Sequence, residues 1–239
     1  NAAEAVYEEK KIEETEVVFL MDRFGYTKTI DKATYERNKE TADGESKYLF
    51  TCMNTDKVCI FTDKGRMHTV KVQEVPYGRF RDKGTPIDNL SNYDSTQERI
   101  LYAGSLESVK ASSLLFVTKT GMLKQVAGEE FDVSKRTIAA TKLSGEDELL
   151  FVGVSDPMEY VVLQSVNGYF LKFLKEEVPY KKKTAIGVRG IRLGEKDALE
   201  EAYLLENRSE YTIVYKDKEV TLNKLKLAKR DTKGTKIRV

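Results

Sequence analysis

The sequence has few of the residues on which many catalytic and metal sites depend. Its 239 residues include one histidine, two cysteines, four prolines and no tryptophan. A Ser/His/Asp triad or a histidine-based metal site would have to rest on His68 alone, so we interpret His68 as a strand-face residue. Two cysteines do not make a secreted disulfide framework. Cys52 and Cys59 flank a possible turn and could face each other on paired strands, but we expect free thiols.

Phosphate loops and long apolar runs are also absent. No G-x-x-x-x-G-K-[ST] motif occurs, and nothing pairs two carboxylates in a pocket, so a propeller glycosidase remains only as an alternative. No apolar run approaches the roughly 20 residues that span a bilayer, and no leader pattern opens the chain. With 40% apolar and 33% charged residues, the composition is that of a globular protein. We therefore expect a cytoplasmic protein.

A repeated hairpin dominates what is present. Four apolar residues, a short polar turn with glycine and an alternating strand with a basic residue make up VCIFTDKGRMHTV. The copies lie near residues 17–30, 58–70, 114–126 and 160–173, with a degenerate fifth at 212–225. The turn glycines are Gly25, Gly65, Gly121 and Gly168, at propeller-like spacings. By that spacing Val220 takes the glycine position of the fifth copy.

Further strand-like segments lie between the hairpins. They precede each hairpin from the second copy on, at 48–53, 100–105, 149–154 and 202–207, and together with the hairpins they offer about four short strands to each repeat. One such sheet cannot bury both faces, whereas several side by side share a core. We expect an all-β, propeller-like disc of about five to six four-stranded blades at residues 17–239. Residues 1–16 are acidic and predict a linker or short helix.

Basic residues gather in the connections that follow the hairpins. Two of these connections resemble each other through E-V-P-Y, at 74–77 and 177–180. Lys and Arg at equivalent places in successive repeats would give the disc a belt of positive charge, which suits binding and bending of DNA through its phosphates. Lysine-rich turns can also simply keep strands soluble. A protein-binding propeller that uses its face loops is the second hypothesis, but the longest connection, 76–99, is polar and charged.

The order of these motifs resembles a known family. The repeated hairpin, the G-Y-x-K strand at 25–28 followed by Tyr35 and Arg37, and K-x-x-x-I-G-V-R-G-I-R-L at 183–193 resemble the C-terminal domain of the A subunit of bacterial type IIA topoisomerases, the family of DNA gyrase and topoisomerase IV. The resemblance extends from Val17 onward. It implies a β-pinwheel whose outer edge binds and bends DNA beside the cleavage gate.

The resemblance also limits what this chain does. The nucleophilic tyrosine of the family lies upstream of this domain, so no residue here is expected to be catalytic. We interpret Tyr26, Tyr77, Tyr169 and Tyr180 as core or rim packing residues and not as stacking platforms for bases. The family implies an ATP-dependent parent enzyme that uses ATP and Mg, with the rest of the A subunit and the separate ATPase subunit as partners. We expect no cofactor or metal in the domain itself, and a monomeric fragment.

One departure from the gyrase pattern is informative. The A subunit of gyrase carries a box with glutamine, paired arginines and glycines after its first hairpin, whereas residues 35–45 here read YERNKETADGE. The chain is therefore more similar to the A subunit of topoisomerase IV, and we expect it to guide strand passage and wrap DNA more weakly than a gyrase. The residues predicted to contact DNA are Lys28, Arg37, Lys39, Lys71, Arg79, Arg81, Lys83, Lys124, Lys135, Arg136, Lys172, Lys181, Lys182, Lys183, Arg189, Arg192, Lys229, Arg230 and Lys233.

Overall fold

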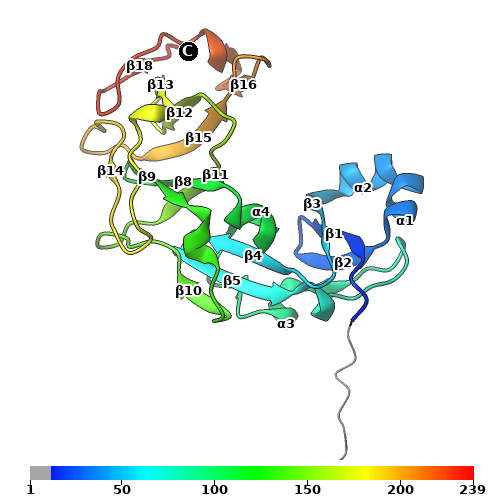
Figure 1. The fold of residues 1–239 in the computed structure, drawn as a ribbon. Coiled ribbons are helices and arrows are strands. Elements are labelled where there is room, and N and C mark those ends of the chain that lie inside the picture. The colour runs from blue at the N-terminus through cyan, green and yellow to red at the C-terminus, as the bar shows by residue number, and fades with distance from the viewer. Residues whose placement is uncertain (1–11) are drawn as a thin grey trace, which may run out of the picture. The chain divides into compact units, whose positions relative to one another are not determined.

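The structure, a computed structural model, describes residues 12–239. These residues form four four-stranded antiparallel sheets and one two-stranded hairpin (Figure 1). The chain divides into two compact units, the first reaching to Lys57 and including Lys71–Leu90, the second made of Val58–Val70 and Ser91–Val239. No helix of residues 12–239 is long and apolar enough to cross a membrane.

The first unit is built on one sheet with the strand order β3-β1-β2-β6. Its strands are β1 (Glu16–Asp22), β2 (Tyr26–Ile30), β3 (Ser46–Met53) and β6 (Thr85–Pro86). Its helices and 3₁₀ turn are α1 (Lys32–Arg37), α2 (Lys39–Glu45), α3 (Ile87–Leu90) and η1 (Val72–Glu74). Asp31 caps α1 by accepting a hydrogen bond from the Thr34 amide. The segment expected as a plain connection after the first hairpin thus holds two helices, and Ala42 of α2 packs on Val18 and Leu20.

The second unit contains three sheets and the last hairpin. The first sheet, in the order β10-β5-β4-β7, contains β4 (Lys57–Thr62), β5 (Arg66–Lys71), β7 (Ile100–Ser105) and β10 (Thr137–Ala139). The second, β11-β8-β9-β14, contains β8 (Ser113–Thr118), β9 (Met122–Ala127), β11 (Leu149–Val154) and β14 (Val188–Arg189). The third, β15-β12-β13-β18, contains β12 (Tyr160–Ser165), β13 (Tyr169–Leu174), β15 (Leu199–Leu205) and β18 (Thr235–Lys236). The remaining elements are β16 (Thr212–Tyr215), β17 (Lys218–Thr221), α4 (Leu106–Lys110), η2 (Gly128–Phe131), η3 (Lys175–Glu177) and η4 (Leu222–Lys224).

The hairpin turns follow the sequence prediction in the first four copies. Their glycines all have positive φ, for example +89° at Gly25 and +91° at Gly121, a conformation that glycine adopts without steric cost. The fifth copy differs: its turn is formed by Lys216 and Asp217, with φ of 44° and 66°. The placement of Val220 in the turn was wrong, because Val220 lies within β17 and pairs with Ile213.

Each four-stranded sheet is completed by a strand from the next repeat. The additional strands pair with the hairpin that precedes them in the chain; these are β3, β7, β11 and β15. The sequence pattern groups each of them with the hairpin that follows, so that grouping is corrected. The fourth strand of each sheet comes from beyond the following hairpin, so β14 lies beside β9 and β18 beside β13 (Figure 1). Within the second unit, neighbouring repeats are therefore tied together through backbone hydrogen bonds as well as through packing.

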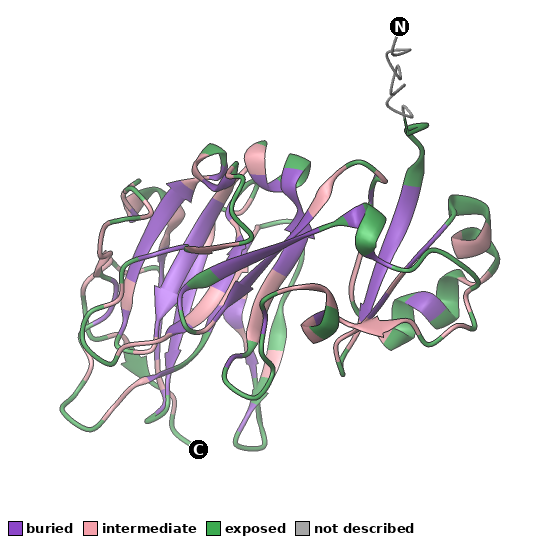
Figure 2. Cartoon of the chain, turned by 90° about the horizontal axis from the view of Figure 1, so that it is seen from below, coloured by how far each residue is buried: buried purple, intermediate pink, exposed green. Residues whose placement is uncertain are grey.

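The sheets of the second unit share apolar cores. Between the first and second sheets, the Phe61 and Phe131 rings meet edge to face with centroids 5.1 Å apart, and Phe116 packs on both. Between the second and third sheets, Leu115 and Phe173 belong to one buried cluster. Figure 2 shows the buried residues concentrated in the strands, with exposed and intermediate residues in the connections. These shared cores agree with the expected side-by-side blades.

Two smaller expectations have different outcomes. Cys52 and Cys59 are free thiols, as predicted, and both are buried, but they lie on strands of different sheets and not on paired strands. Burial, with Asp56 and Glu16 nearby, raises the pKa of the Cys52 thiol to about 12. Residues 12–15 form no regular structure and Glu16 begins β1, so the helix of the two predicted alternatives, linker or helix, does not extend to this end of the segment. The rest of that segment lies outside the described residues.

Candidate nucleic-acid interface

Three connections are equivalent residue by residue. The basic loops, defined as residues 75–84, 178–187 and 225–234, each run from a 3₁₀ turn to the fourth strand of the preceding sheet. Their register is fixed by hydrogen bonds to the hairpin strand beside them. The Gly78 amide donates to the Thr29 carbonyl oxygen, the Lys181 amide to that of Gln125, and the Ala228 amide to that of Lys172. All three loops therefore present equivalent positions in the same way.

The fifth position of every basic loop is an exposed cation. It is Arg79 in the first loop, Lys182 in the second and Lys229 in the third. Arg79 leaves 69% of its side chain exposed while it approaches Asp82 at 3.6 Å. Because the three cations recur at one register position on equivalent loops, they are the most regular charged feature of residues 12–239.

The third position of the basic loops is exposed as well. Tyr77 is 63% exposed and Tyr180 59%, so of the predicted core or rim positions these two tyrosines do not occupy the core. Tyr26 and Tyr169 are partly buried, as the packing interpretation predicts. A lysine approaches each of these two rings. The Lys83 ammonium lies 4.3 Å from the centroid of the Tyr26 ring, and the Lys233 ammonium lies 5.1 Å from that of the Tyr169 ring. The loops thus place aromatic surface next to positive charge.

In the second and third basic loops the sixth position holds a cation that is bound by the protein itself, whereas the first loop has Phe80 there. Lys183 donates from Nζ to the Glu130 carbonyl oxygen at 2.7 Å, and its amide donates to Glu130 Oε1 at 3.1 Å. Arg230 repeats this pairing with Glu177, at 2.9 Å from Nε to the carbonyl oxygen and 3.3 Å from the amide to Oε1. Both side chains were predicted to contact DNA, and both fasten their loop to the 3₁₀ turn of the preceding repeat.

Lys124, also predicted to contact DNA, is a buried group. It is 1% exposed, and its Nζ donates to the carbonyl oxygens of Lys182 at 2.9 Å, Lys183 at 3.3 Å and Ala185 at 2.6 Å. Burial lowers the pKa of the Lys124 amine to about 8, although the Glu130 carboxylate opposes the shift. An ammonium group in this position faces backbone oxygens and not solvent, so the structure corrects the predicted surface role.

Lys28 and Lys172 are engaged in related ways. Lys28 Nζ donates to the carbonyl oxygens of Phe80 and, at 2.8 Å, Asp82. Burial lowers the pKa of the Lys28 amine. Lys172, one strand position further along, is 8% exposed and donates to the Asn223 carbonyl oxygen at 2.7 Å. These two ammonium groups also point at the backbone, contrary to the predicted surface role.

The connection after the second hairpin is arranged differently. His68, three residues after its turn glycine as Lys28 and Lys124 are, is 2% exposed, as expected of a strand-face residue. Its Nε2 lies 3.0 Å from Glu98 Oε2 and its Nδ1 2.9 Å from Thr137 Oγ1. Burial raises the pKa of Glu98, but hydrogen bonds from Thr62 and His68 outweigh it and leave that pKa lowered. No cluster of three metal-ligating side chains occurs within residues 12–239.

The remaining predicted cations are exposed apart from Lys181, and Lys39 among them forms an ion pair with Asp43 at 2.8 Å. Those exposed on loops, strand ends or the first two helices are Arg37, Lys39, Lys71, Arg81, Lys83, Lys135, Arg136 and Lys233. Lys181 is partly buried. Arg189 and Arg192 converge on Asp231, at 2.5 Å and 3.4 Å, and the Arg189 hydrogen bond, with Arg192 nearby, lowers the pKa of the Asp231 carboxyl.

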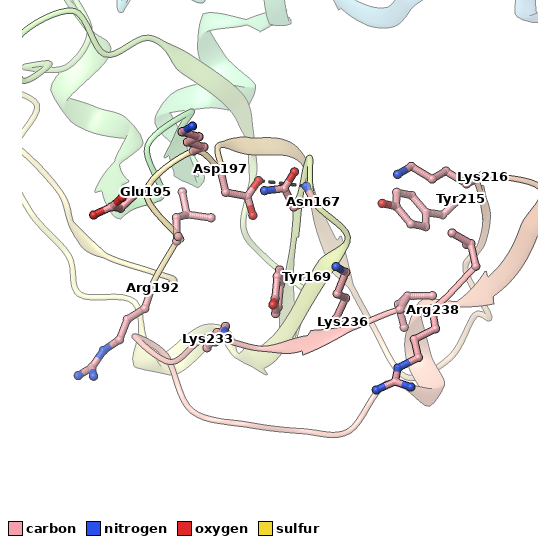
Figure 3. A pocket seen from close by; sticks show the side chains of 15 residues that line it. Asn167, Tyr169, Arg192, Glu195, Asp197, Tyr215, Lys216, Lys233, Lys236 and Arg238 are labelled. Atoms are coloured by element: carbon pink, nitrogen blue, oxygen red, sulfur yellow. Dashed lines mark hydrogen bonds between the residues drawn. The ribbon is translucent and has the colours of Figure 1, made fainter.

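A basic hollow of about 700 Å³ lies at the turn end of the third sheet in the second unit. Figure 3 shows Lys233 and Lys236 on either side of Tyr169 and Arg238 farther away, with Asp197 accepting a hydrogen bond from the Asn167 amide at 3.0 Å. The sequence-predicted set missed Lys236 and Arg238. The signal that could have found them is the G-T-K-I-R segment at 234–238, which resembles G-V-R-G-I-R at 187–192.

These features define a class of protein: a propeller-like repeat domain with exchanged strands and exposed cations in equivalent loops. The chain also matches the family model described as "DNA gyrase C-terminal domain, beta-propeller" at residues 56–96, 112–156 and 159–204. The match covers more than half of the chain. The protein therefore belongs to this family, as the sequence motifs predicted.

Named relatives come from both branches of the family. The chain is 28% identical to the A subunit of DNA gyrase from Lawsonia intracellularis over 84% of this chain and 26% of that protein. It is 29% identical to the A subunit of DNA topoisomerase 4 from Bacillus subtilis over 83% of this chain and 27% of that protein. The chain thus spans about a quarter of the length of these relatives.

Solved structures share the fold. The crystal structure of the C-terminal domain of DNA topoisomerase IV superposes with a TM-score of 0.83 at 24% identity, covering 95% of this chain and 74% of that one. The E. coli ParC C-terminal domain gives 0.70 at 18% identity, covering 93% of this chain and 94% of that one. The predicted β-pinwheel class is confirmed, and the comparisons support the topoisomerase interpretation over a protein-interaction propeller.

Proposed function

We propose that this chain binds and bends duplex DNA for a type IIA topoisomerase, without catalysing a reaction itself. The observation that carries the proposal is the recurrence of Arg79, Lys182 and Lys229 at one position of three equivalent loops. Cations in equivalent positions neutralise phosphates without reading bases. The duplex would be held by its backbone and in no fixed sequence register.

Bending is the energetic demand that this arrangement has to meet. Bending 20–30 base pairs smoothly through 40–90° costs roughly 1–6 kcal/mol. Several charge-neutralising contacts offset that cost at low salt, because each releases condensed counterions. The exposed Tyr77 and Tyr180 lie beside these cations and add apolar surface against the sugar edge. A bent segment would then be presented for strand passage.

The parent protein is the larger part of the proposal. Relatives named as the A subunits of gyrase and topoisomerase 4 support a parent that is a topoisomerase. We infer an ATP- and Mg-dependent enzyme in the cytoplasm, with a separate ATPase subunit as partner and its catalytic tyrosine outside this chain. The segment at 35–45 has no paired arginines and forms α1 and α2, which favours topoisomerase IV over gyrase.

A salt series tests DNA binding. Binding of the chain to a mixed-sequence linear duplex is compared with that of the triple variant Arg79→Ala, Lys182→Ala and Lys229→Ala. Each phosphate contact removed flattens the log–log salt slope by about 0.9. We expect the triple variant to lose that amount for each of its three cations.

A matched variant controls for net charge. Lys47, Lys142 and Arg208 are exposed cations outside the basic loops, and their change to alanine removes the same charge. We expect this control to leave the slope near its original value. Equal flattening by both variants would show diffuse attraction in place of a defined interface. If the original chain does not bind at low salt, a protein partner becomes the better hypothesis.

A further inference from the structure

Lys124 and Lys28 each lie three residues after the turn glycine of their hairpin. Each donates hydrogen bonds to backbone carbonyl oxygens of one basic loop. Lys28 binds the carbonyl oxygens of Phe80 and Asp82, and Lys124 binds those of the equivalent Lys183 and Ala185. We propose that these two lysines, Lys124 buried and Lys28 partly buried, are positioning residues for DNA binding, which hold the loops in the conformation that presents the exposed cations. The inference rests on the proposed function.

The donor count explains why a lysine is needed. An ammonium group has three N–H donors and no acceptor. Around Lys124, three carbonyl oxygens converge within 3.3 Å, so each donor has one partner. An apolar side chain of similar length would fill the space but leave these carbonyl groups without their donor. The loop would then lose its side-chain donor, and its turn would be held only by the backbone hydrogen bond from the Ala185 amide to the Lys182 carbonyl oxygen.

The clamp, meaning the hydrogen bonds from Lys124 Nζ to the loop carbonyl oxygens, also includes the residue that carries the exposed cation. One of the three oxygens bound by Lys124 is the carbonyl of Lys182 itself. Lys182 is exposed, whereas its peptide group is fixed from beneath by the ammonium. Lys124 thus fixes the backbone from which the Lys182 side chain extends, although Lys124 itself does not contact DNA. Preorganising a long cationic side chain lowers the ordering cost of each phosphate contact.

The other repeats provide an internal comparison. After the second hairpin, the strand position holds His68, which binds Glu98 and Thr137 instead of loop carbonyls. In the third sheet of the second unit the position holds Leu171, and its loop keeps only the Arg230–Glu177 pairing, whereas the loop beside Lys124 has the equivalent Lys183–Glu130 pairing as well as the lysine. Lysine is found in the two sheets where loop carbonyls converge on that position. This distribution fits a loop-holding role and not a general feature of the strand.

The test is a double-variant cycle at pH 7 on the whole chain. Lys182→Ala removes the proposed phosphate contact and keeps the backbone carbonyl. Lys124→Met removes the clamp. We expect each single variant to flatten the log–log salt slope by about 0.9. In the Lys124→Met background, Lys182→Ala should add little, because the contact is already lost.

Hydrogen exchange separates positioning from general destabilisation. We expect Lys124→Met to speed exchange at the amide of Lys181 and its loop neighbours while the β8–β9 amides stay protected. Val117→Ala, a buried change in the adjacent strand β8, is the matched control and should lower the melting temperature without changing the salt slope. If Lys124→Met does not fold, a cycle with Lys28→Met and Arg79→Ala replaces it, in which Lys28 holds the carbonyl groups of Phe80 and Asp82 next to the exposed cation.

The outcomes distinguish the two proposals. If Lys182→Ala flattens the slope and Lys124→Met does not, the clamp inference is overturned and DNA binding by the loop stands. Strict additivity of the two variants also overturns the clamp, because independent contacts add. If neither variant changes the slope of a chain that binds DNA, the loop is not part of the interface, and the proposed function fails at this site.

Discussion

The buried Lys124 makes a specific prediction about stability and pH. Its amine has a folded-state pKa of about 8, against 10.5 for an ordinary lysine, chiefly because burial disfavours the charged form. Between these two values the unfolded chain binds more protons than the folded chain. Stability therefore rises with pH across this window, by linkage. A shift of 2.5 units at 1.36 kcal/mol each gives a gain of about 3 kcal/mol.

The measurement is urea unfolding of the original chain and of Lys124→Met from pH 7 to pH 10.5. Titratable groups that do not interact with Lys124 cancel in the difference, and the two charges that act on its amine, the Glu130 carboxylate and the Lys181 ammonium, are present in both proteins. We expect the free energy of unfolding of the original chain to increase relative to that of Lys124→Met as pH rises, by up to about 3 kcal/mol. Parallel curves for the two proteins would refute the reasoning, because they would mean that Lys124 titrates normally.

Two further predictions concern packing. Gly234 has a φ of 79°, and an added Cβ would lie 2.6 Å from the Phe170 carbonyl oxygen, so Gly234→Ala should cost more than the roughly 1–2 kcal/mol of the left-handed conformation alone. Gly145→Ala, with φ of 56° and open space, is its control in urea unfolding, and equal losses would contradict the clash. Phe131→Ala should cost about 3–5 kcal/mol by calorimetry, whereas the 71% exposed Phe24 should tolerate alanine; a small loss at Phe131 would contradict its core role.

Local pattern was enough to predict the hairpins. Alternating apolar residues around Gly25, Gly65, Gly121 and Gly168 identify two strands and a turn, because strand period and positive φ are local properties. The fifth hairpin was misregistered since Lys216 and Asp217 form its turn without glycine. Pairing between repeats is not local: β9 pairs with β14 more than 60 residues later, and two-residue strands carry little periodicity.

The candidate site was predicted only in part for a different reason. Lys124 and Lys182 are both lysines, yet Lys124 is buried, with 1% of its surface exposed, whereas Lys182 lies on the surface. Charge composition cannot distinguish an ammonium group that meets water from one that meets carbonyl oxygens, because both satisfy its donors. The distinguishing signal is the combination of a lysine three residues after the turn glycine with a ten-residue loop that ends in glycine. Where the combination is missing, as at His68, the residue three positions after the turn glycine binds other side chains and no loop carbonyl oxygens.

The exchange of strands between repeats has a consequence for synthesis of the chain on the ribosome. The edge of β9 is complete only once β14 has been made, and the same delay of about 60 residues separates β13 from β18. At roughly 5–20 residues per second, each nascent sheet keeps an open edge for about 3–12 s. An open edge invites pairing with another nascent chain. Slow decoding within these intervals would therefore raise aggregation even though the finished protein is unchanged.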